Sequence, residues 1–189
     1  MDLLKEKFPF LSDEDLESLA QISDVQTYGR REEIISIGKY SGDFMYTING
    51  ILRGYYIDDL GEERNVFLVN NNMFFGSPEC ILDDKASNYI FETVTNTSLI
   101  VFEYKKLEQL ASENKNIFRF YTDAVKSILR FFVIRLNDFT CSSPQERFLK
   151  LQDSRPLLIK NAKTKLLANF LGLSPNSLSR IKARLFKKR

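Results

Sequence analysis

A long stretch without proline or glycine, residues 115–139, constrains the fold more than any other part of the chain. One set of side chains recurs along it at alternating spacings of four and three, as in a coiled-coil seam: Phe118, Thr122, Val125, Leu129, Phe132, Leu136 and Phe139. A second stripe consists of Ile117, Tyr121, Ala124, Ile128 and Phe131. A helix with two apolar faces must be covered on two sides.

We expect the rest of the chain to cover one side of this helix and an identical helix from a second copy to cover the other, which makes a homodimer. The alternative is a helix buried between two parts of a monomer. The residues expected at the dimer interface are Phe118, Tyr121, Val125, Ile128, Leu129, Phe132, Leu136 and Phe139.

Residues 24–102 consist of short runs rich in Val, Ile, Phe and Tyr, separated by turn residues every eight to twelve positions. This pattern is typical of an all-β roll or barrel. Asn49-Gly50, between two such runs, predicts a β-hairpin. Residues 58–61 and 70–72 predict two further turns. Before the roll, Ser12 and Asp15 predict a capping box that opens a helix at Asp13, and residues 105–113 predict another short helix.

Residues 161–186 have the pattern of a helix-turn-helix. Leu166, Leu167 and Phe170 lie at helical spacing, and Gly172 can end that helix with a positive φ. Ser174 is a good N-cap before Pro175, so a second helix is predicted there. The buried stripe predicted for this second helix is Leu178, Ile181 and Leu185. Its opposite face carries polar and basic residues that can contact bases and phosphates: Asn176, Ser177, Ser179, Arg180 and Arg184.

An α-hairpin on a protein surface can show the same pattern, but the charge distribution favours DNA binding. Residues 142–189 hold 12 Lys and Arg against 2 Asp and Glu, whereas the preceding 141 residues hold 15 against 23. The nearly neutral total therefore hides a basic tail on an acidic body, as expected if the tail meets phosphates. Only Lys187, Lys188 and Arg189 follow Phe186, so we expect no β-hairpin wing after the second helix.

The composition disfavours an enzyme, a metalloprotein and a secreted or membrane protein. The chain contains no His, which removes the commonest general base and metal ligand. Cys80 and Cys141 are too few for a disulfide framework or a thiolate cluster. The amino terminus lacks a signal-peptide pattern, and no apolar run is long enough to span a membrane. We expect a cytoplasmic protein without cofactors, metals or a membrane partner.

These features predict an α+β protein in three parts. Residues 1–113 are expected to form a jelly-roll (double-stranded β-helix) domain with flanking helices, and residues 114–140 the long dimerisation helix. Residues 141–189 are expected to form the helix-turn-helix domain. It begins at a hinge where Pro144 opens a helix over 145–152, and residues 155–159 lead on to the helix-turn-helix.

This order of parts resembles the CRP/FNR superfamily of bacterial transcription regulators, whose roll is cyclic nucleotide-binding-like. The most specific segments are residues 171–181, similar to the recognition segment, and Phe74-Phe75-Gly76, similar to the start of the phosphate-binding cassette. Gly38, Gly50 and Gly61 match glycine turns of the roll.

The resemblance implies a homodimer that binds a palindromic operator in double-stranded DNA, and it is compatible with a further contact to RNA polymerase. The predicted DNA-binding residues are Ser174, Asn176, Ser177, Ser179, Arg180, Lys182 and Arg184. Asn176, Ser179 and Arg180 would read bases, and the lack of a wing resembles a shortened branch of the superfamily.

The predicted effector pocket departs from this family pattern. In cyclic-nucleotide binders a Glu follows the cassette Gly, and an Arg-Ser pair lies further on. Here those positions are Ser77, Ser87 and Asn88. Lys85 is an inexact substitute for the Arg, because Lys lacks the planar fork that binds phosphate in a bidentate manner. Glu79 is the candidate to contact the ribose, although Pro78 alters the local backbone. The candidate pocket residues are Gly76, Ser77, Glu79, Lys85, Ser87 and Asn88.

We therefore expect a regulator that does not bind cyclic AMP in the usual way, with an unknown small-molecule effector or none. One alternative is a module that binds a cyclic nucleotide or another small molecule and does not bind DNA. Another is a cupin-like enzyme on the β-roll, which would lack the usual His metal ligands.

Overall fold

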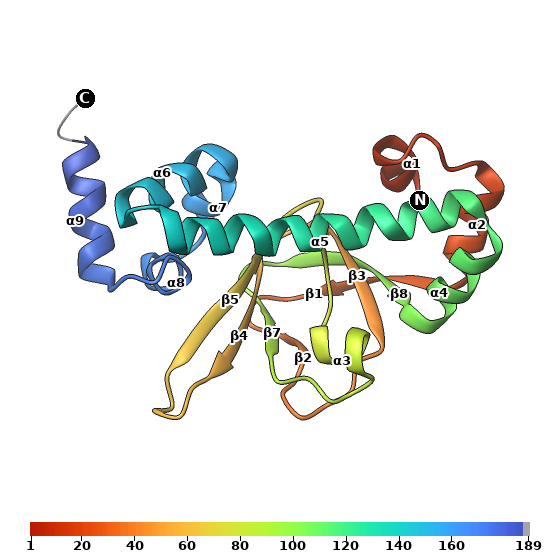
Figure 1. The fold of residues 1–189 in the computed structure, drawn as a ribbon, viewed down its shortest axis with the longest axis horizontal. Helices are drawn as coiled ribbons and strands as arrows, with labels where there is room; N and C mark the ends of the chain where they lie inside the picture. The colour runs from red at the N-terminus through yellow and green to blue at the C-terminus, as the bar shows by residue number, and fades with distance from the viewer. Residues whose placement is uncertain (187–189) are drawn as a thin grey trace.

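A computed structural model describes residues 1–186 and shows a β-roll and a helical terminal domain joined by one long helix (Figure 1). The helices are α1 (Asp2–Lys7), α2 (Asp13–Gln21), α3 (Pro78–Asp83), α4 (Tyr104–Glu113), α5 (Lys115–Cys141), α6 (Pro144–Ser154), α7 (Pro156–Asn161), α8 (Thr164–Phe170) and α9 (Pro175–Phe186). The strands are β1 (Ser23–Tyr28), β2 (Glu33–Ile35), β3 (Asp43–Asn49), β4 (Leu52–Ile57), β5 (Glu63–Val69), β6 (Phe74–Phe75), β7 (Ile90–Thr93) and β8 (Thr97–Glu103). The expected α+β class is confirmed. The three domain boundaries stay a prediction, and the missing wing concerns residues 187–189, which lie outside the described ones.

Two antiparallel sheets form the roll, with strand orders β1-β8-β3-β6 and β2-β7-β4-β5. The predicted hairpin at Asn49-Gly50 is wrong, because β3 pairs with β8 and β6 while β4 pairs with β5 and β7. Gly50 does have the positive φ of a turn, +104°, and its amide donates to Asn71 Oδ1 at 3.0 Å. The turn sends the chain from one sheet to the other. A local turn signal marks a change of direction and does not select the pairing partner.

The turn at residues 58–61 does make a hairpin, since β4 and β5 pair on either side of it. The capping box that opens α2 is confirmed as well. Ser12 Oγ accepts from the Asp15 amide at 3.1 Å, and Asp15 Oδ2 accepts from the Ser12 amide at 2.8 Å. These features depend on neighbours within four residues, which is why the sequence predicts them.

Aromatic and aliphatic side chains fill the interior of the roll. Phe67 lies at the centre of this packing, with ring centroids 5.1 Å from Phe91 and 5.4 Å from Tyr89. The ring of Phe75 also packs on that of Phe91, with centroids 5.6 Å apart. The buried members of this cluster are Ile35, Met45, Leu52, Phe67, Val69, Phe75, Phe91, Leu99 and Val101. Phe131 and Phe132 of α5 also pack against Phe67, at 6.2 and 5.3 Å, so the long helix contributes to this core.

The long helix α5 runs along the roll and on to the terminal domain (Figure 1). Asn114 caps its first turn, because its Oδ1 accepts from the amides of Asn116 and Ile117 at 2.8 and 3.1 Å. Phe120 and Ala124 are fully buried against the roll. The predicted long helix is confirmed. No helix in residues 1–186 has both the length and the hydropathy needed to cross a bilayer.

Pro144 occupies the first position of α6, as predicted, and Ser143 before it forms a second capping box with Glu146 that was not predicted from the sequence. Residues 155–159, expected as a connection, instead contribute to the short helix α7. Pro156 occupies its first helical position, where a missing amide hydrogen costs nothing. The helices α6–α9 share a core whose centre is Phe148, Leu158, Leu167 and Leu178.

Candidate nucleic-acid interface

The turn between α8 and α9 is a Schellman motif closed by Gly172. The Gly172 amide donates to the Asn169 carbonyl at 3.0 Å, and the Leu173 amide donates to the Ala168 carbonyl at 2.8 Å. Gly172 has φ +68°, and a Cβ there would lie 2.7 Å from Cε1 of Phe139. Glycine is thus required both by the backbone conformation and by the close approach of α5.

The start of α9 is also as predicted. Ser174 Oγ accepts from the Ser177 amide at 3.1 Å, and Pro175 opens the helix. Leu178 and Ile181 are buried and Leu185 packs against the same core. The predicted apolar stripe therefore holds α9 to the terminal domain.

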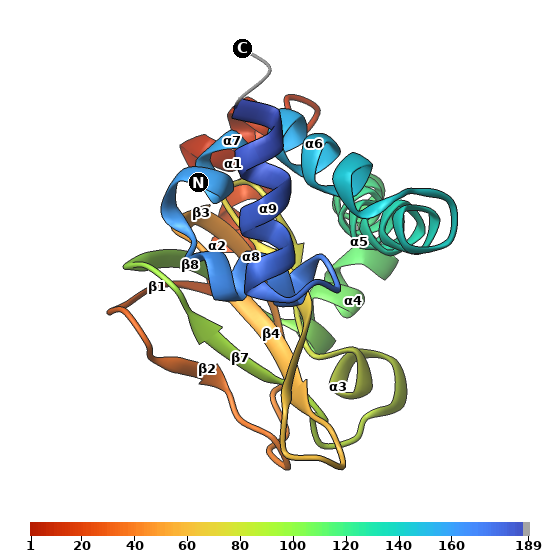
Figure 2. The same ribbon diagram turned by 90° about the vertical axis from the view of Figure 1, so that its left-hand side faces the viewer.

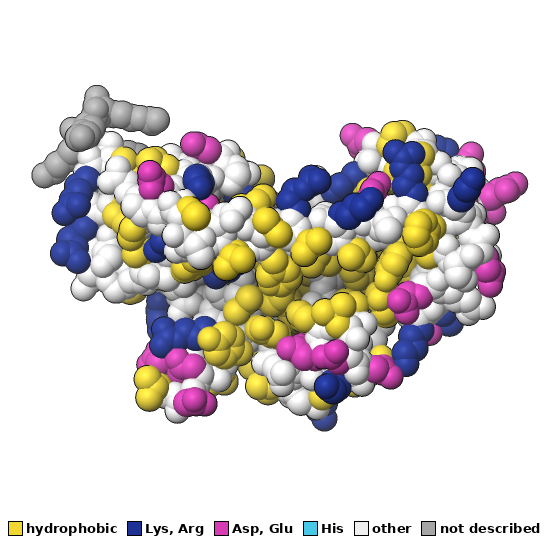
Figure 3. Space-filling model, viewed as in Figure 1, with side chains coloured by type: hydrophobic (Ala, Val, Ile, Leu, Met, Phe, Trp, Pro, Cys, Tyr) yellow, Lys and Arg dark blue, Asp and Glu magenta, His cyan; other side chains and the backbone are white. Residues whose placement is uncertain are grey.

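The opposite face of α9 points away from the protein. Asn176, Ser179, Arg180 and Arg184 are exposed. Arg180 Nη2 lies 3.4 Å from Ser177 Oγ, a weak contact that leaves most of its N–H groups free. Figure 2 shows α9 in front of the other elements at the outer end of the molecule, and Figure 3 shows Lys and Arg side chains gathered at that edge. The exposed face offers amide, hydroxyl and guanidinium groups to a partner.

Two of the predicted DNA-binding residues lie to the side of this face. Lys182 is half-buried with Nζ 5.7 Å from the ring centroid of Phe148 on α6. Ser177 is half-buried and its hydroxyl is 2.9 Å from that of Ser174. The structure brings together Asn176, Ser179, Arg180 and Arg184 and leaves Lys182 at the rim.

Contacts from the terminal domain to β5 were missed by sequence reasoning. Asn169 on α8 donates from Nδ2 to the Glu63 carbonyl at 2.7 Å and accepts from the Asn65 amide on Oδ1 at 2.7 Å. Arg155 donates to the Leu68 carbonyl at 2.8 Å. The only sequence signal was the polar Asn169 within an apolar helix. These bonds fix the terminal domain against an edge strand of the roll.

The predicted dimer-interface residues divide between two environments. Tyr121, Ile128 and Phe132 are half-buried and pack on the roll, and Tyr121 shares a 2.8 Å hydroxyl contact with Tyr104. The exposed members are Phe118, Val125, Leu129, Leu136 and Phe139. Figure 3 shows hydrophobic side chains along this helix and over the groove between it and the roll. The outward face of α5 at Phe118, Val125, Leu129 and Leu136 is thus apolar and exposed within residues 1–186. Phe139 instead lies under Arg135 and Arg147.

The predicted effector-pocket residues mainly bond with one another. The Glu79 carboxylate accepts from Ser77 Oγ at 3.0 Å and from Asn88 Nδ2 at 3.3 Å. Ser77 is fully buried. Ser87, 1% exposed, donates its hydroxyl to the Tyr89 carbonyl at 2.9 Å.

Two further features make this site a poor cradle for a phosphate. A Cβ on Gly76 would lie 2.5 Å from Ile81 Cδ1, so the backbone here is packed against α3. Lys85 is exposed, and among residues 1–186 no Lys or Arg forms an ion pair with Glu79. Because the negative charge of Glu79 has no arginine beside it, this site disfavours the binding of a phosphate anion. The same described range contains no group of three His, Cys, Asp or Glu suited to a metal ion.

No protein-family model and no curated protein sequence matches this chain. Solved structures do. FixK2 from Bradyrhizobium japonicum superposes with a TM-score of 0.73 at 18% identity, over 88% of this chain and 86% of that one. A mutant of CooA from Carboxydothermus hydrogenoformans gives 0.72 at 11% identity, over 100% and 84%.

CLP from Xanthomonas campestris, described as a c-di-GMP-responsive global regulator, gives a TM-score of 0.69 at 17% identity, over 92% of this chain and 91% of that one. Identities this low establish a shared fold. The β-roll, the long helix and the terminal helical domain of this chain have the fold of the CRP/FNR regulators.

Proposed function

We propose that this chain is a homodimeric, sequence-specific DNA-binding transcriptional regulator of the CRP/FNR type that acts in the bacterial cytoplasm. The observation that carries the proposal is the division of α9 into two faces. Leu178 and Ile181 are buried, while Asn176, Ser179 and Arg180 point outward at the end of the molecule. A helix held by its apolar stripe at an outer edge can enter the major groove of a duplex.

Each outward side chain has a chemical role in this proposal. The guanidinium of Arg180 can donate two hydrogen bonds to O6 and N7 of a guanine. Asn176 and Ser179 are placed to contact neighbouring base edges, and Arg184 and the rim residue Lys182 to contact phosphates. Ser174 and Ser177 shape the start of the helix.

The apolar outward face of α5 supports the dimer. Leu129 and Leu136 are 61% and 64% exposed, which is unusual for leucines on a well-packed helix. A second copy of α5 would cover both residues together with Phe118 and Val125. A two-fold axis along α5 would present two copies of α9 to half-sites about 34 to 36 Å apart on a palindromic operator.

The roll supports a regulator that does not bind cyclic AMP in the usual way. The cavity of about 360 Å³ between the roll and α5 is lined mainly by apolar side chains, among them Phe67 and Phe75. The cassette carboxylate, Glu79, is occupied by internal bonds. Transcriptional control then depends on another signal or on the amount of protein present.

Selection of bound sequences from random duplexes with the full chain tests this proposal. We expect enrichment of a palindrome, and affinity for the selected duplex that falls steeply with salt concentration. Cyclic AMP should leave the selected sequence and the affinity unchanged. Recovery of no common sequence, with salt-independent binding, would instead favour a small-molecule-binding module that does not bind DNA.

A further inference from the structure

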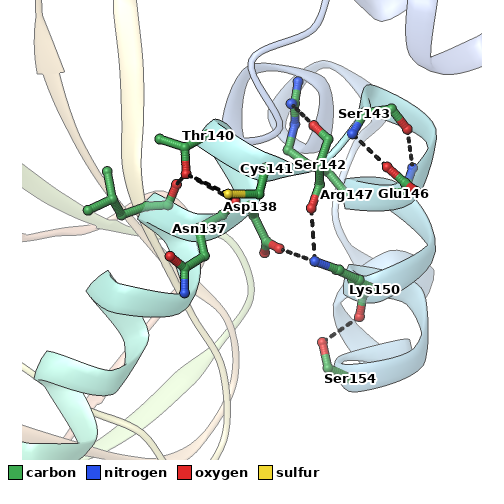
Figure 4. A network of polar contacts seen from close by, with 11 residues as sticks. Asn137, Asp138, Thr140, Cys141, Ser142, Ser143, Glu146, Arg147, Lys150 and Ser154 are labelled. Atoms are coloured by element: carbon green, nitrogen blue, oxygen red, sulfur yellow. Dashed lines mark hydrogen bonds and ion pairs between the residues drawn. The ribbon is translucent and has the colours of Figure 1, made fainter.

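A cleft of about 700 Å³ lies where the long helix meets the terminal domain. The last turns of α5 form one wall, and α6, the α6–α7 junction and the end of α8 form the other. Figure 4 shows part of its rim, where Lys150 on α6 bonds to Asp138 and Ser142 at 2.8 and 2.9 Å. A cleft of this size can take a small organic molecule.

Three arginines line the cleft, and each comes from a different segment: Arg135 from α5, Arg147 from α6 and Arg155 from the α6–α7 junction. Among residues 1–186, the hydrogen bonds that they donate all go to backbone carbonyls. Arg135 donates to Asn65 at 2.9 Å, and Arg155 donates to Leu68 at 2.8 Å.

Arg147 donates to the Leu171 and Ser142 carbonyls at 3.2 and 2.9 Å. A guanidinium has five N–H donors, so each of the three arginines keeps more than half of its donors unused.

Phenyl rings hold the guanidinium groups in place. The Cζ of Arg135 lies 3.9 Å from the ring centroid of Phe170. Arg135 and Arg147 both lie over the ring of Phe139, each with Cζ 4.9 Å from its centroid. These cation–π contacts restrict the positions of the Arg135 and Arg147 guanidinium groups.

The three arginines of this cluster have no ion-pair partner among residues 1–186. Among residues 1–186, no carboxylate lies within 4.0 Å of a nitrogen of the three arginines. The carboxylates on the cleft are Asp138, which is paired with Lys150, and the exposed Asp153. Burial, followed by the charge of Arg155, lowers the pKa of Arg135 to about 10. Partly buried cations without counter-ions are costly, and an anion would relieve that cost.

We propose that this cleft is a binding site for a small organic anion that carries a phosphate group. Arg135, Arg147 and Arg155 would donate to the phosphate oxygens. Leu151, Leu171 and the phenyl rings would contact the apolar part of the ligand. The site is separate from the cassette of the roll, and the proposal does not depend on DNA binding.

Calorimetric titration of the full chain with phenyl phosphate and with inorganic phosphate tests this site. We expect phenyl phosphate to bind with a Kd below about 1 mM, and inorganic phosphate to bind several-fold more weakly because it lacks the apolar part. Arg135→Gln should weaken phenyl phosphate binding at least tenfold. Arg130→Gln is the matched control, because Arg130 is exposed on the same helix and does not line the cleft.

Circular dichroism melting checks that each variant is folded. Arg147→Gln removes a cleft arginine from a different helix and should give the same tenfold loss. This variant tests the site if Arg135→Gln does not fold. Equal weakening in Arg130→Gln, or no binding at about 10 mM phenyl phosphate, would overturn the proposal. So would loss of binding only in Arg184→Gln, which would assign the anion to the face of α9.

Discussion

The terminal helical domain and the β-roll use their polar side chains in opposite ways. On α9, Asn176, Ser179 and Arg180 are exposed and have few partners within the chain. In the cassette of the roll, Ser77 and Asn88 donate to Glu79. A region can have the backbone architecture of a binding site while its polar groups bond to one another and are not available to a ligand. Binding capacity therefore has to be judged from which groups remain unpaired, and the fold alone is insufficient.

The largest expected effect comes from separating the two copies of the terminal domain. Leu129→Lys places a charge on the exposed apolar face of α5, so the dimer should dissociate. Loss of the second half-site should lower affinity for a palindromic duplex at least 100-fold, since linked binding gains factors of about 10² to 10⁴. Light scattering and gel-shift titration measure the two changes.

Lys126→Ala is the control for Leu129→Lys, because Lys126 is an exposed residue of α5 outside the seam. It should leave both the mass and the affinity unchanged. A Leu129→Lys protein that remains a dimer would show that the outward face of α5 is not the interface.

The next largest effect is expected on the free energy of unfolding, when one glycine with positive φ is replaced in each of the two regions. Gly172→Ala should lower the free energy of unfolding by about 2 to 3 kcal/mol, because the new Cβ is strained and also meets Phe139. Gly61→Ala has a similar φ, +77°, but nothing lies within 4 Å of its Cβ, so about 1 kcal/mol is expected. Urea unfolding gives both values. Equal losses would show that the close approach of α5 to the turn is unimportant.

Arg180→Ala tests base reading on the exposed face of α9. We expect a loss of about 1 to 3 kcal/mol in binding to the selected duplex and relaxed specificity at one base pair in each half-site. Lys160→Ala, an exposed cation on α7, should change affinity far less. Unchanged specificity in the Arg180 variant would place the reading residues elsewhere.

The smallest effect is expected in the roll. Glu79→Gln keeps the shape of the side chain and the acceptor for one of its two bonds, so stability should change by less than about 1 kcal/mol. DNA affinity should stay within twofold of the parent protein. Thermal unfolding with and without cyclic AMP completes the test. A clear rise in Tm with cyclic AMP, abolished by Glu79→Gln, would contradict the structural role of Glu79.

Local signals in the sequence predicted much of the terminal domain. The start of α6 at Pro144, the N-cap at Ser174, the glycine turn at Gly172 and the stripe of Leu178 and Ile181 all depend on residues within a few positions of one another. The exposed face of α9 follows from this stripe by helical geometry. For the same reason the long helix α5 was predictable with both of its apolar stripes.

The sequence by itself therefore determined the order of the roll, the long helix and the terminal helices, the starts of α2, α6 and α9, and the polar face of α9, because the helix starts and the polar face follow from interactions between near neighbours. Tertiary structure decided which strand pairs with β3, which of the apolar residues of α5 face the roll, and the gathering of Arg135, Arg147 and Arg155 around one cleft. The bonds from Asn169 to Asn65 and from Arg155 to Leu68 join residues that are 104 and 87 positions apart. Such contacts form only when separate elements pack together, so no local pattern in the chain encodes them.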